Sequence, residues 1–184
     1  GASGGLVVEA RIGELRARAP WDGTADLQVT LAGPRPSLEP LALDVAFVID
    51  TTGSMGDEIQ RIQQSLLAVT AKLRGLGQEV DLRYGCVLSK DLHDEYLTSV
   101  HPFAGDVAAF DQALASVRAG GGGDGPESLN QGLAAGVHEL AWRDRAAKVA
   151  FVITDASPHM DYPGDAPYPA SLQAAVAAGV KVHA

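Results

Sequence analysis

From residue 42 onward, apolar runs of strand length alternate with segments whose apolar residues recur at helical spacing. The run from Leu43 to Ile49 is too continuous for a strand with one face in water, so it predicts a strand buried on both sides. After Gly53, apolar residues from Met55 to Leu73 step by 4, 3, 4, 3 and 4 positions, which is the pattern of one helix face.

The same alternation continues toward the carboxyl end of the chain. We expect further strands at residues 80–88, 96–103, 148–154 and 180–183, and helices over residues 107–117, 129–140 and 172–179. Buried strands that alternate with amphipathic helices specify an α/β fold, with a doubly wound, mostly parallel sheet and helices on both faces. Ligands of such folds bind at the carboxyl ends of the strands, so the residues that follow each strand are the most informative about function.

Oxygen-bearing side chains gather in three loops of this expected sheet. The stretch Asp50-Thr51-Thr52-Gly53-Ser54 follows the first strand, Asp155 follows the strand at residues 148–154, and Asp124-Gly125-Pro126-Glu127 stands before a helix. Hard cations such as Mg²⁺ and Ca²⁺ take oxygen ligands, and Mg²⁺ keeps several waters beside one or two direct carboxylates. The sequence therefore predicts an open site for a divalent metal at this edge.

This combination resembles the von Willebrand factor A domain, a Rossmann-like fold, and its metal-ion-dependent adhesion site. The resemblance covers residues 42–184. It implies that Asp50, Thr52 and Ser54 hold Mg²⁺, or Ca²⁺ or Mn²⁺, from the first loop, and that Asp155 acts from the third loop, often through water. It also implies a metal-dependent module for adhesion or protein interaction, in which an acidic side chain of the partner protein completes the metal site.

The middle loop departs from the commonest pattern of that family, in which a threonine supplies the ligand. The stretch Asp124-Gly125-Pro126-Glu127 is similar to the integrin β-subunit variant, and this likeness implies Glu127, in preference to Asp124, as the direct ligand. Asp57 and Glu58 stand where integrin β subunits place acids for an adjacent second metal. Gly122 replaces the asparagine that precedes Asp124 in integrins.

Several of these residues also have a purely structural interpretation. Asp124 and Glu127 have the spacing of a capping box, so they could satisfy free N–H groups of the helix that follows. The hydroxyls of the first loop could belong to an ordinary turn or helix cap. Asp57 and Glu58 lie in a first helical turn, where acids complement the helix dipole, and for these two residues the structural interpretation is favoured.

A long proline-rich segment, residues 159–169, follows Asp155 on the same edge of the expected sheet. Loops on a rigid scaffold often carry binding residues, so this segment could contact a partner; alternatively, it is only a solvated connection. The candidate contact residues are His159, Asp161, Tyr162 and Tyr168. We do not expect His159 to bind the metal, because imidazole suits Zn²⁺ and other transition metals.

The alternative function is enzymatic. The first loop is also similar to the phosphorylation loop of P-type ATPases and haloacid-dehalogenase-like enzymes, and this likeness implies a Mg²⁺-dependent phosphohydrolase or phosphotransferase with Asp50 as the nucleophile. However, Thr52 replaces the second aspartate typical of the phosphatases, and no cap insertion is evident. Lys90 and Lys148 are candidates for the required lysine by type only. We therefore expect a binding module and no enzyme.

Charge and composition exclude other classes of partner. Fourteen Lys and Arg against 23 Asp and Glu give a net charge of −9, without the clustered basic residues that nucleic acid or an anionic membrane requires. No window approaches the roughly 18 consecutive apolar residues of a membrane-spanning helix. The lone Cys86 forbids an internal disulfide. The compartment stays open, with an extracellular or cell-surface location favoured by the family resemblance.

Residues 1–40 lie outside the family resemblance. Apolar residues at 6–12 and 27–31 predict two strands, and the stretch from Gly33 to Pro40 predicts a stiff connector, so we expect a β extension or part of a flanking β domain before a family domain at 41–184. Family members usually continue with a sixth strand and a final helix, which we expect this domain to lack. An open sheet edge would then favour self-association.

Overall fold

A computed structural model describes residues 6–12, 15–21, 28–31, 40–74, 80–123 and 125–184. The chain divides into two compact units, Gly1–Glu39 and Pro40–Ala184. The first unit contains strands β1 (Leu6–Ile12) and β2 (Leu15–Trp21), which pair antiparallel. The second strand of this unit was expected at residues 27–31. That expectation is wrong for residues 28–31, which form no strand, whereas Leu27 lies outside the described residues. Small alanines carry much of the alternation of β2, so its apolar signal is weak.

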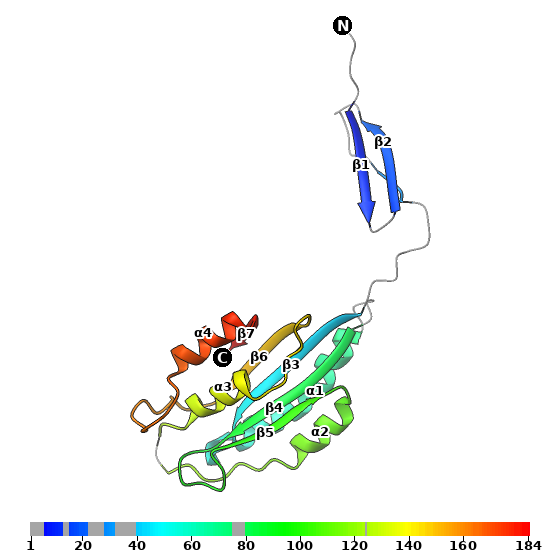
Figure 1. The fold of residues 1–184 in the computed structure, drawn as a ribbon. Helices are drawn as coiled ribbons and strands as arrows, with labels where there is room; N and C mark the ends of the chain where they lie inside the picture. The colour runs from blue at the N-terminus through cyan, green and yellow to red at the C-terminus, as the bar shows by residue number, and fades with distance from the viewer. Residues whose placement is uncertain (1–5, 13–14, 22–27, 32–39, 75–79, 124) are drawn as a thin grey trace. The chain divides into compact units, whose positions relative to one another are not determined.

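The second unit has the expected doubly wound architecture (Figure 1). Its elements are β3 (Leu41–Asp50), the short 3-10 helix η1 (Gly53–Met55), α1 (Gly56–Arg74), β4 (Val80–Ser89), β5 (Thr98–Ala104), α2 (Val107–Ala115), α3 (Leu129–His138), β6 (Ala147–Ile153), α4 (Tyr168–Ala177) and β7 (Val180–His183). The sheet order is β5-β4-β3-β6-β7, and only β5 runs antiparallel to its neighbour. The prediction of an α/β fold with a mostly parallel sheet is therefore confirmed.

Helices cover both faces of this sheet because β3 is apolar on both sides. Val45 and Ile49 belong to one core, which includes Ile59 of α1 and Phe110 of α2. Ala46 belongs to the other core, whose further members come from α3, the turn after it, α4 and the sheet: Val87, Leu133, Ala135, Val137, Leu140, Ala150, Ala175 and Val180. Burial of β3 between two layers fixes its end, and hence Asp50, at the centre of the carboxyl edge (Figure 1).

Two glycines let α3 approach the sheet closely. A Cβ atom on Gly136 would lie 2.8 Å from Val48 Cγ2, and one on Gly132 would lie 3.0 Å from Ser89 Oγ. A larger residue at either position would require the helix or the side chains of the sheet beneath it to shift. The glycines therefore allow α3, which follows the middle candidate loop, to lie close to the sheet.

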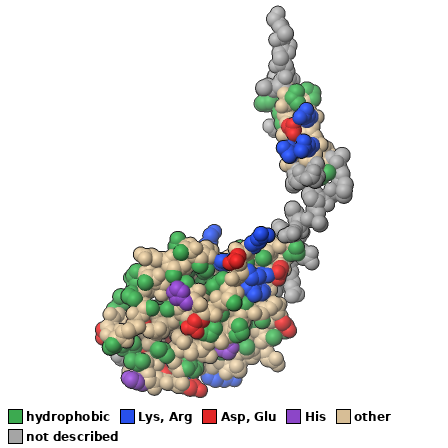
Figure 2. Space-filling view, in the orientation of Figure 1, with side chains coloured by type: hydrophobic (Ala, Val, Ile, Leu, Met, Phe, Trp, Pro, Cys, Tyr) green, Lys and Arg blue, Asp and Glu red, His purple; other side chains and the backbone are tan. Residues whose placement is uncertain are grey.

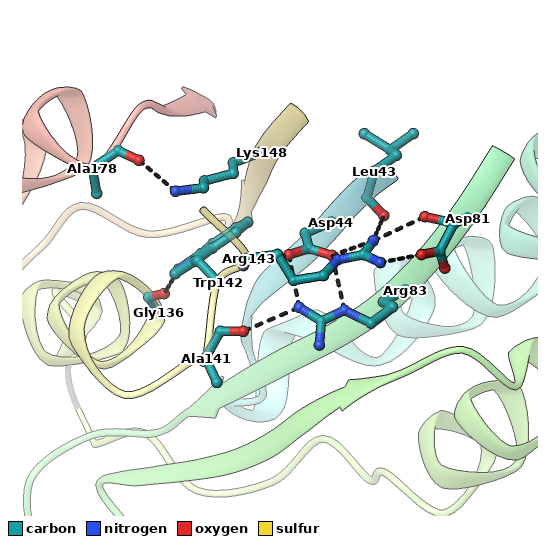
Figure 3. Close-up of polar contacts among 10 residues, drawn as sticks. All are labelled: Leu43, Asp44, Asp81, Arg83, Gly136, Ala141, Trp142, Arg143, Lys148 and Ala178. Atoms are coloured by element: carbon teal, nitrogen blue, oxygen red, sulfur yellow. Dashed lines mark hydrogen bonds and ion pairs between the residues drawn. The ribbon is translucent and has the colours of Figure 1, made fainter. Parts of the chain in front are cut away.

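A buried ion-pair cluster holds the opposite, amino end of the sheet together (Figure 3). Asp44 of β3 is fully buried and accepts hydrogen bonds from Arg83 Nε and Nη2 at 2.9 and 2.8 Å, and from Arg143 N and Nε at 2.9 Å. Arg143 also pairs with Asp81. Burial tends to raise the pKa of Asp44, but the bonds from the two arginines outweigh it and hold that pKa below its usual value. On the face that Figure 2 shows, acidic and basic side chains gather near the start of β3.

An apolar cleft of about 720 Å³ opens beside α1, on the side of the sheet that Phe47 and Phe151 share. Ile62 of α1 and His183 of β7 also line it. The sheet ends here in β7, an edge strand of four residues. Self-association through an open sheet edge stays a prediction. Among the described residues, no helix combines the length and apolar character needed to cross a membrane.

Replacing Asp44 by Ala should lower the free energy of unfolding by about 3 kcal/mol, because breaking one side of a buried ion pair costs roughly 3–5 kcal/mol. We expect the low end of that range, since Arg83 and Arg143 remain 24% and 26% exposed and keep other acceptors. Urea unfolding measures the change. The control Asp144→Ala alters an exposed acid and should cost less than about 0.5 kcal/mol. Equal losses in the two variants would contradict a stabilising role for the cluster.

Candidate metal centre

Asp50 ends β3 as a buried carboxylate whose orientation is fixed by hydroxyl groups. Its side chain is 2% exposed. Asp50 Oδ1 accepts hydrogen bonds from Thr52 N at 2.9 Å and from Thr52 Oγ1 at 2.7 Å, while Oδ2 accepts one from Thr154 Oγ1 at 2.9 Å. These donors come from the loop after β3 and from the end of β6, so two neighbouring strand ends hold one carboxylate.

Ser54 and Asp155 form the exposed part of the same edge. Ser54 Oγ donates a hydrogen bond to Asp155 Oδ1 at 2.9 Å, although the two residues are 101 positions apart in the sequence. Both residues are exposed. The first and third predicted loops therefore meet, as their positions after parallel strands required.

Glu127 brings the middle loop to this edge. Glu127 is 6% exposed. Both of its backbone polar groups bond to the segment after β6: Glu127 N donates to Ser157 O, and His159 N donates to Glu127 O, each at 3.0 Å. Its Oε2 atom is buried and has no hydrogen-bond partner among the described residues. Burial, and next the nearby charge of Asp50, raise the pKa of Glu127 to about 7, against the hydrogen bond of Thr52. A cation would satisfy this uncompensated oxygen.

The glycine-rich stretch lets this loop approach its neighbours closely. Gly121 and Gly122 have φ values of 83° and 78°, which favour glycine. A Cβ on Gly122 would lie 2.7 Å from Glu127 Oε1, and one on Gly121 would overlap the carboxylate of Asp94. Asp94 Oδ2 in turn accepts hydrogen bonds from Gly122 N at 2.9 Å and from Asp91 N at 3.1 Å. The glycines are therefore packed between two acids.

The predicted metal ligands differ in where the structure places them. Asp50, Thr52 and Glu127 come together, and Ser54 joins Asp155 beside them. Asp124 lies outside the described residues. Among the residues that are described, no three His, Cys, Asp or Glu side chains cluster as a metal site of that composition requires. Any cation here would need hydroxyl groups and water in addition to the carboxylates.

The two candidates for a second metal lie in the first turn of α1. Asp57 is exposed, and Glu58 pairs with Arg61 at 2.9 Å. This placement agrees with their interpretation as acids that complement the helix dipole.

The predicted contact residues lie in the segment between β6 and α4, and they divide into buried and exposed members. His159 is 8% exposed and stacks on Tyr162 with 3.9 Å between ring centroids, while its Nδ1 atom lies 3.0 Å from Asp161 Oδ1. Asp161 is exposed, and Tyr168 is 41% exposed at the start of α4. Asp161 and Tyr168 are thus the exposed members of this set, whereas His159 is buried and Tyr162 is half-buried.

Three site residues were missed in the sequence. Thr154 stands at a strand end directly before Asp155, and Asp91 and Asp94 follow β4. The rule that led to Asp50 and Asp155, attention to the residues after a strand, also covers Asp91 and would have found it after the second strand. Asp94 carries no such signal, because its role depends on contact with the distant glycine run.

In metal-free protein, replacing Glu127 by Gln should stabilise the fold at neutral pH. The unfolded carboxyl group ionises near pH 4.5 and the folded one near 7, so ionisation favours unfolding progressively between these values. One pKa unit corresponds to about 1.4 kcal/mol, which gives about 3 kcal/mol in favour of the variant above pH 7. Urea unfolding in EDTA from about pH 5 to 8 measures the difference between the two proteins. A difference that does not change with pH would contradict the raised pKa.

Comparisons with known proteins bear on the same region. A family model of the von Willebrand factor A domain matches residues 44–164. The alpha-protein kinase vwkA of Dictyostelium discoideum is 28% identical over 118 residues, which is 64% of this chain and 19% of that protein. This chain thus spans only a small part of that relative.

Two solved structures share the fold. Proximal thread matrix protein 1 of the mussel byssus has a TM-score of 0.58 at 15% identity, over 78% of this chain and 35% of that one. The pilus adhesin SpaC from Lactobacillus rhamnosus GG has a TM-score of 0.52 at 16% identity, over 80% and 25%. The family match covers more than half of the sequence and includes the strand-end loops described above, so the chain belongs to the von Willebrand factor A domain family.

Proposed function

We propose that this domain is a protein-binding module that depends on a divalent metal. The observation that carries the proposal is the buried, unpartnered Oε2 atom of Glu127 beside Asp50. The residues that would hold the cation are Asp50, Thr52, Ser54, Glu127 and Asp155, with Asp124 as a further candidate from the sequence. All of these ligands offer oxygen, which favours Mg²⁺, Ca²⁺ or Mn²⁺. Once bound, the cation supplies a Lewis-acidic position for a carboxylate.

The partner we propose is a protein that presents an acidic side chain. Asp50 and Glu127 are buried whereas Ser54 and Asp155 are exposed, so the open side of the site faces solvent at the latter pair. Domains of this family act in protein interaction, and one structural neighbour is named a pilus adhesin, which supports an interaction or adhesion role and a cell-surface setting. The nearness of Glu127 to Asp50 supports the integrin β-like variant of the middle loop, whereas Asp124 lies outside the described residues.

The enzymatic alternative has less support. Both oxygens of Asp50 already accept hydrogen bonds, and the side chain is 2% exposed, which disfavours attack on a phosphorus atom. Lys90 is buried near this edge, but its Nζ atom lies 3.8 Å from Glu95 and over the ring of Tyr96 at 5.2 Å. Mg²⁺-dependent hydrolysis of a phosphomonoester that is lost in Asp50→Asn would favour the enzyme.

Calorimetric titration of Mg²⁺, repeated with Ca²⁺, should give binding heat with the wild type and none with Asp50→Ala, because that variant lacks the central carboxylate. Asp144→Ala is the matched control, since Asp144 is exposed and is not a candidate ligand of either metal. A weaker second step that disappears only in Asp57→Ala would support the second metal. Equal heats from wild type and Asp50→Ala would contradict the site.

Peptides selected on the Mg²⁺-loaded domain should lose binding in EDTA, and also when their acidic residue becomes an amide.

Gly122→Ala should weaken Mg²⁺ binding roughly tenfold or more, because a methyl group there meets Glu127 and the backbone has φ of 78°. The control Gly123→Ala adds a methyl group with no atom within 4 Å, at a position without positive φ. Circular dichroism verifies that both variants fold. If both bind Mg²⁺ as the wild type does, Glu127 is not a ligand in its present position.

A further inference from the structure

Asp91 joins three loops of the carboxyl edge through one buried carboxylate. It follows β4 directly after Lys90 and is 5% exposed. Asp91 Oδ1 accepts a hydrogen bond from Ser128 Oγ at 3.0 Å, and the hydroxyl of Tyr162 lies 3.0 Å from Oδ1 and 2.9 Å from Oδ2. Ser128 belongs to the loop of Glu127, and Tyr162 belongs to the segment between β6 and α4.

The hydroxyl of Ser128 serves this contact although the residue stands at a helix cap. Ser128 is the N-cap residue of α3, yet its side chain makes no capping hydrogen bond to the helix. A serine at this position ordinarily accepts a hydrogen bond from the first turn and stabilises the helix. Here the hydroxyl instead donates to Asp91, so the residue next to Glu127 is tied to the β4–β5 loop.

The loop of Glu127 is also joined, through its backbone, to the segment between β6 and α4. Glu127 N donates to Ser157 O, His159 N donates to Glu127 O, and the ring of His159 stacks on Tyr162. Tyr162 in turn contacts the β4–β5 loop, because its hydroxyl donates a hydrogen bond to Asp91. A displacement of Glu127 therefore strains contacts that lead to Tyr162.

We propose that Asp91 is a positioning residue that couples Glu127 to the contact segment between β6 and α4. This inference rests on the proposed function, since it assigns Asp91 a role in metal binding without making it a ligand. A buried carboxylate is costly unless its hydrogen-bond donors are in place. The donors of Asp91 are neutral hydroxyls from two other loops, so the carboxylate is satisfied only when all three loops adopt this arrangement.

The first test uses metal-free protein in EDTA and the variant Tyr162→Phe, which removes only the hydroxyl group. The amide protons of Glu127 and His159, which bond across the two loops, should exchange with solvent about tenfold faster in the variant, as measured by NMR. Tyr168→Phe is the matched control, because it makes the same chemical change in a tyrosine whose hydroxyl does not bond Asp91. Unchanged exchange at both amides in Tyr162→Phe would overturn the proposal.

The second test is a double-mutant cycle on Mg²⁺ affinity with Tyr162→Phe and Asp91→Asn. Each single variant should bind Mg²⁺ roughly fivefold to tenfold more weakly, and the double variant should be no weaker than the weaker single variant. Tyr162→Phe is decisive, because it changes no charge, whereas Asp91→Asn also removes a negative charge near the site. Lower stability with unchanged Mg²⁺ affinity would reduce Asp91 to a structural role and overturn the proposal.

These two tests separate the inference from the function on which it rests. A wild type that binds no Mg²⁺ would refute the proposed function and, with it, the coupling to metal. The exchange measurement would still decide whether Asp91 anchors the two loops. Additive losses of Mg²⁺ affinity in the cycle would show that Tyr162 and Asp91 act independently, and would overturn the coupling while leaving the metal site intact.

Discussion

The carboxyl edge of this domain depends on two carboxylates, Asp50 and Glu127, that are withdrawn from water side by side. Burial disfavours the charged form of Glu127, and the nearby charge of Asp50 adds to this effect, so the pKa of Glu127 is raised. The fold maintains the arrangement with hydroxyl donors to Asp50 and with glycines that admit Glu127. Strained electrostatics of this kind are typical of binding sites, where a ligand supplies the missing opposite charge.

The two ends of β3 show how differently one fold treats buried acids. Asp44 at the amino end is paired with two arginines, which lower its pKa. Its stabilising contribution is therefore lost only as the pH falls below the pKa of an ordinary aspartate. Glu127 at the other end has no cationic partner among the described residues, and its ionisation opposes folding above its unfolded pKa. Complete pairing is typical of a structural acid, whereas the unpaired oxygen of Glu127 is the feature on which the proposed metal site rests.

The sequence predicted features that depend on local periodicity and missed those that depend on distant contacts. The continuous apolar run of β3 and the stripe of α1 gave the architecture, and Asp50 followed from its place at a strand end. Asp44 interrupts an apolar strand, and only Arg83 and Arg143, 39 and 99 residues away, explain it. Asp91 likewise meets Ser128 and Tyr162 across 37 and 71 residues, and no spacing in the sequence marks such pairs.

The division between buried and exposed groups also limits how a partner can approach. Asp50, Glu127 and Asp91 form a floor that is at most 6% exposed, and its hydrogen bonds come from loops that hold one another in place. Ser54 and Asp155 stand at the open side. For the proposed metal-bound site, a single carboxylate on a flexible side chain of the partner has the charge to meet the cation from the side of this exposed pair. The proposed binding surface thus combines buried, hydrogen-bonded acids with an exposed pair, Ser54 and Asp155.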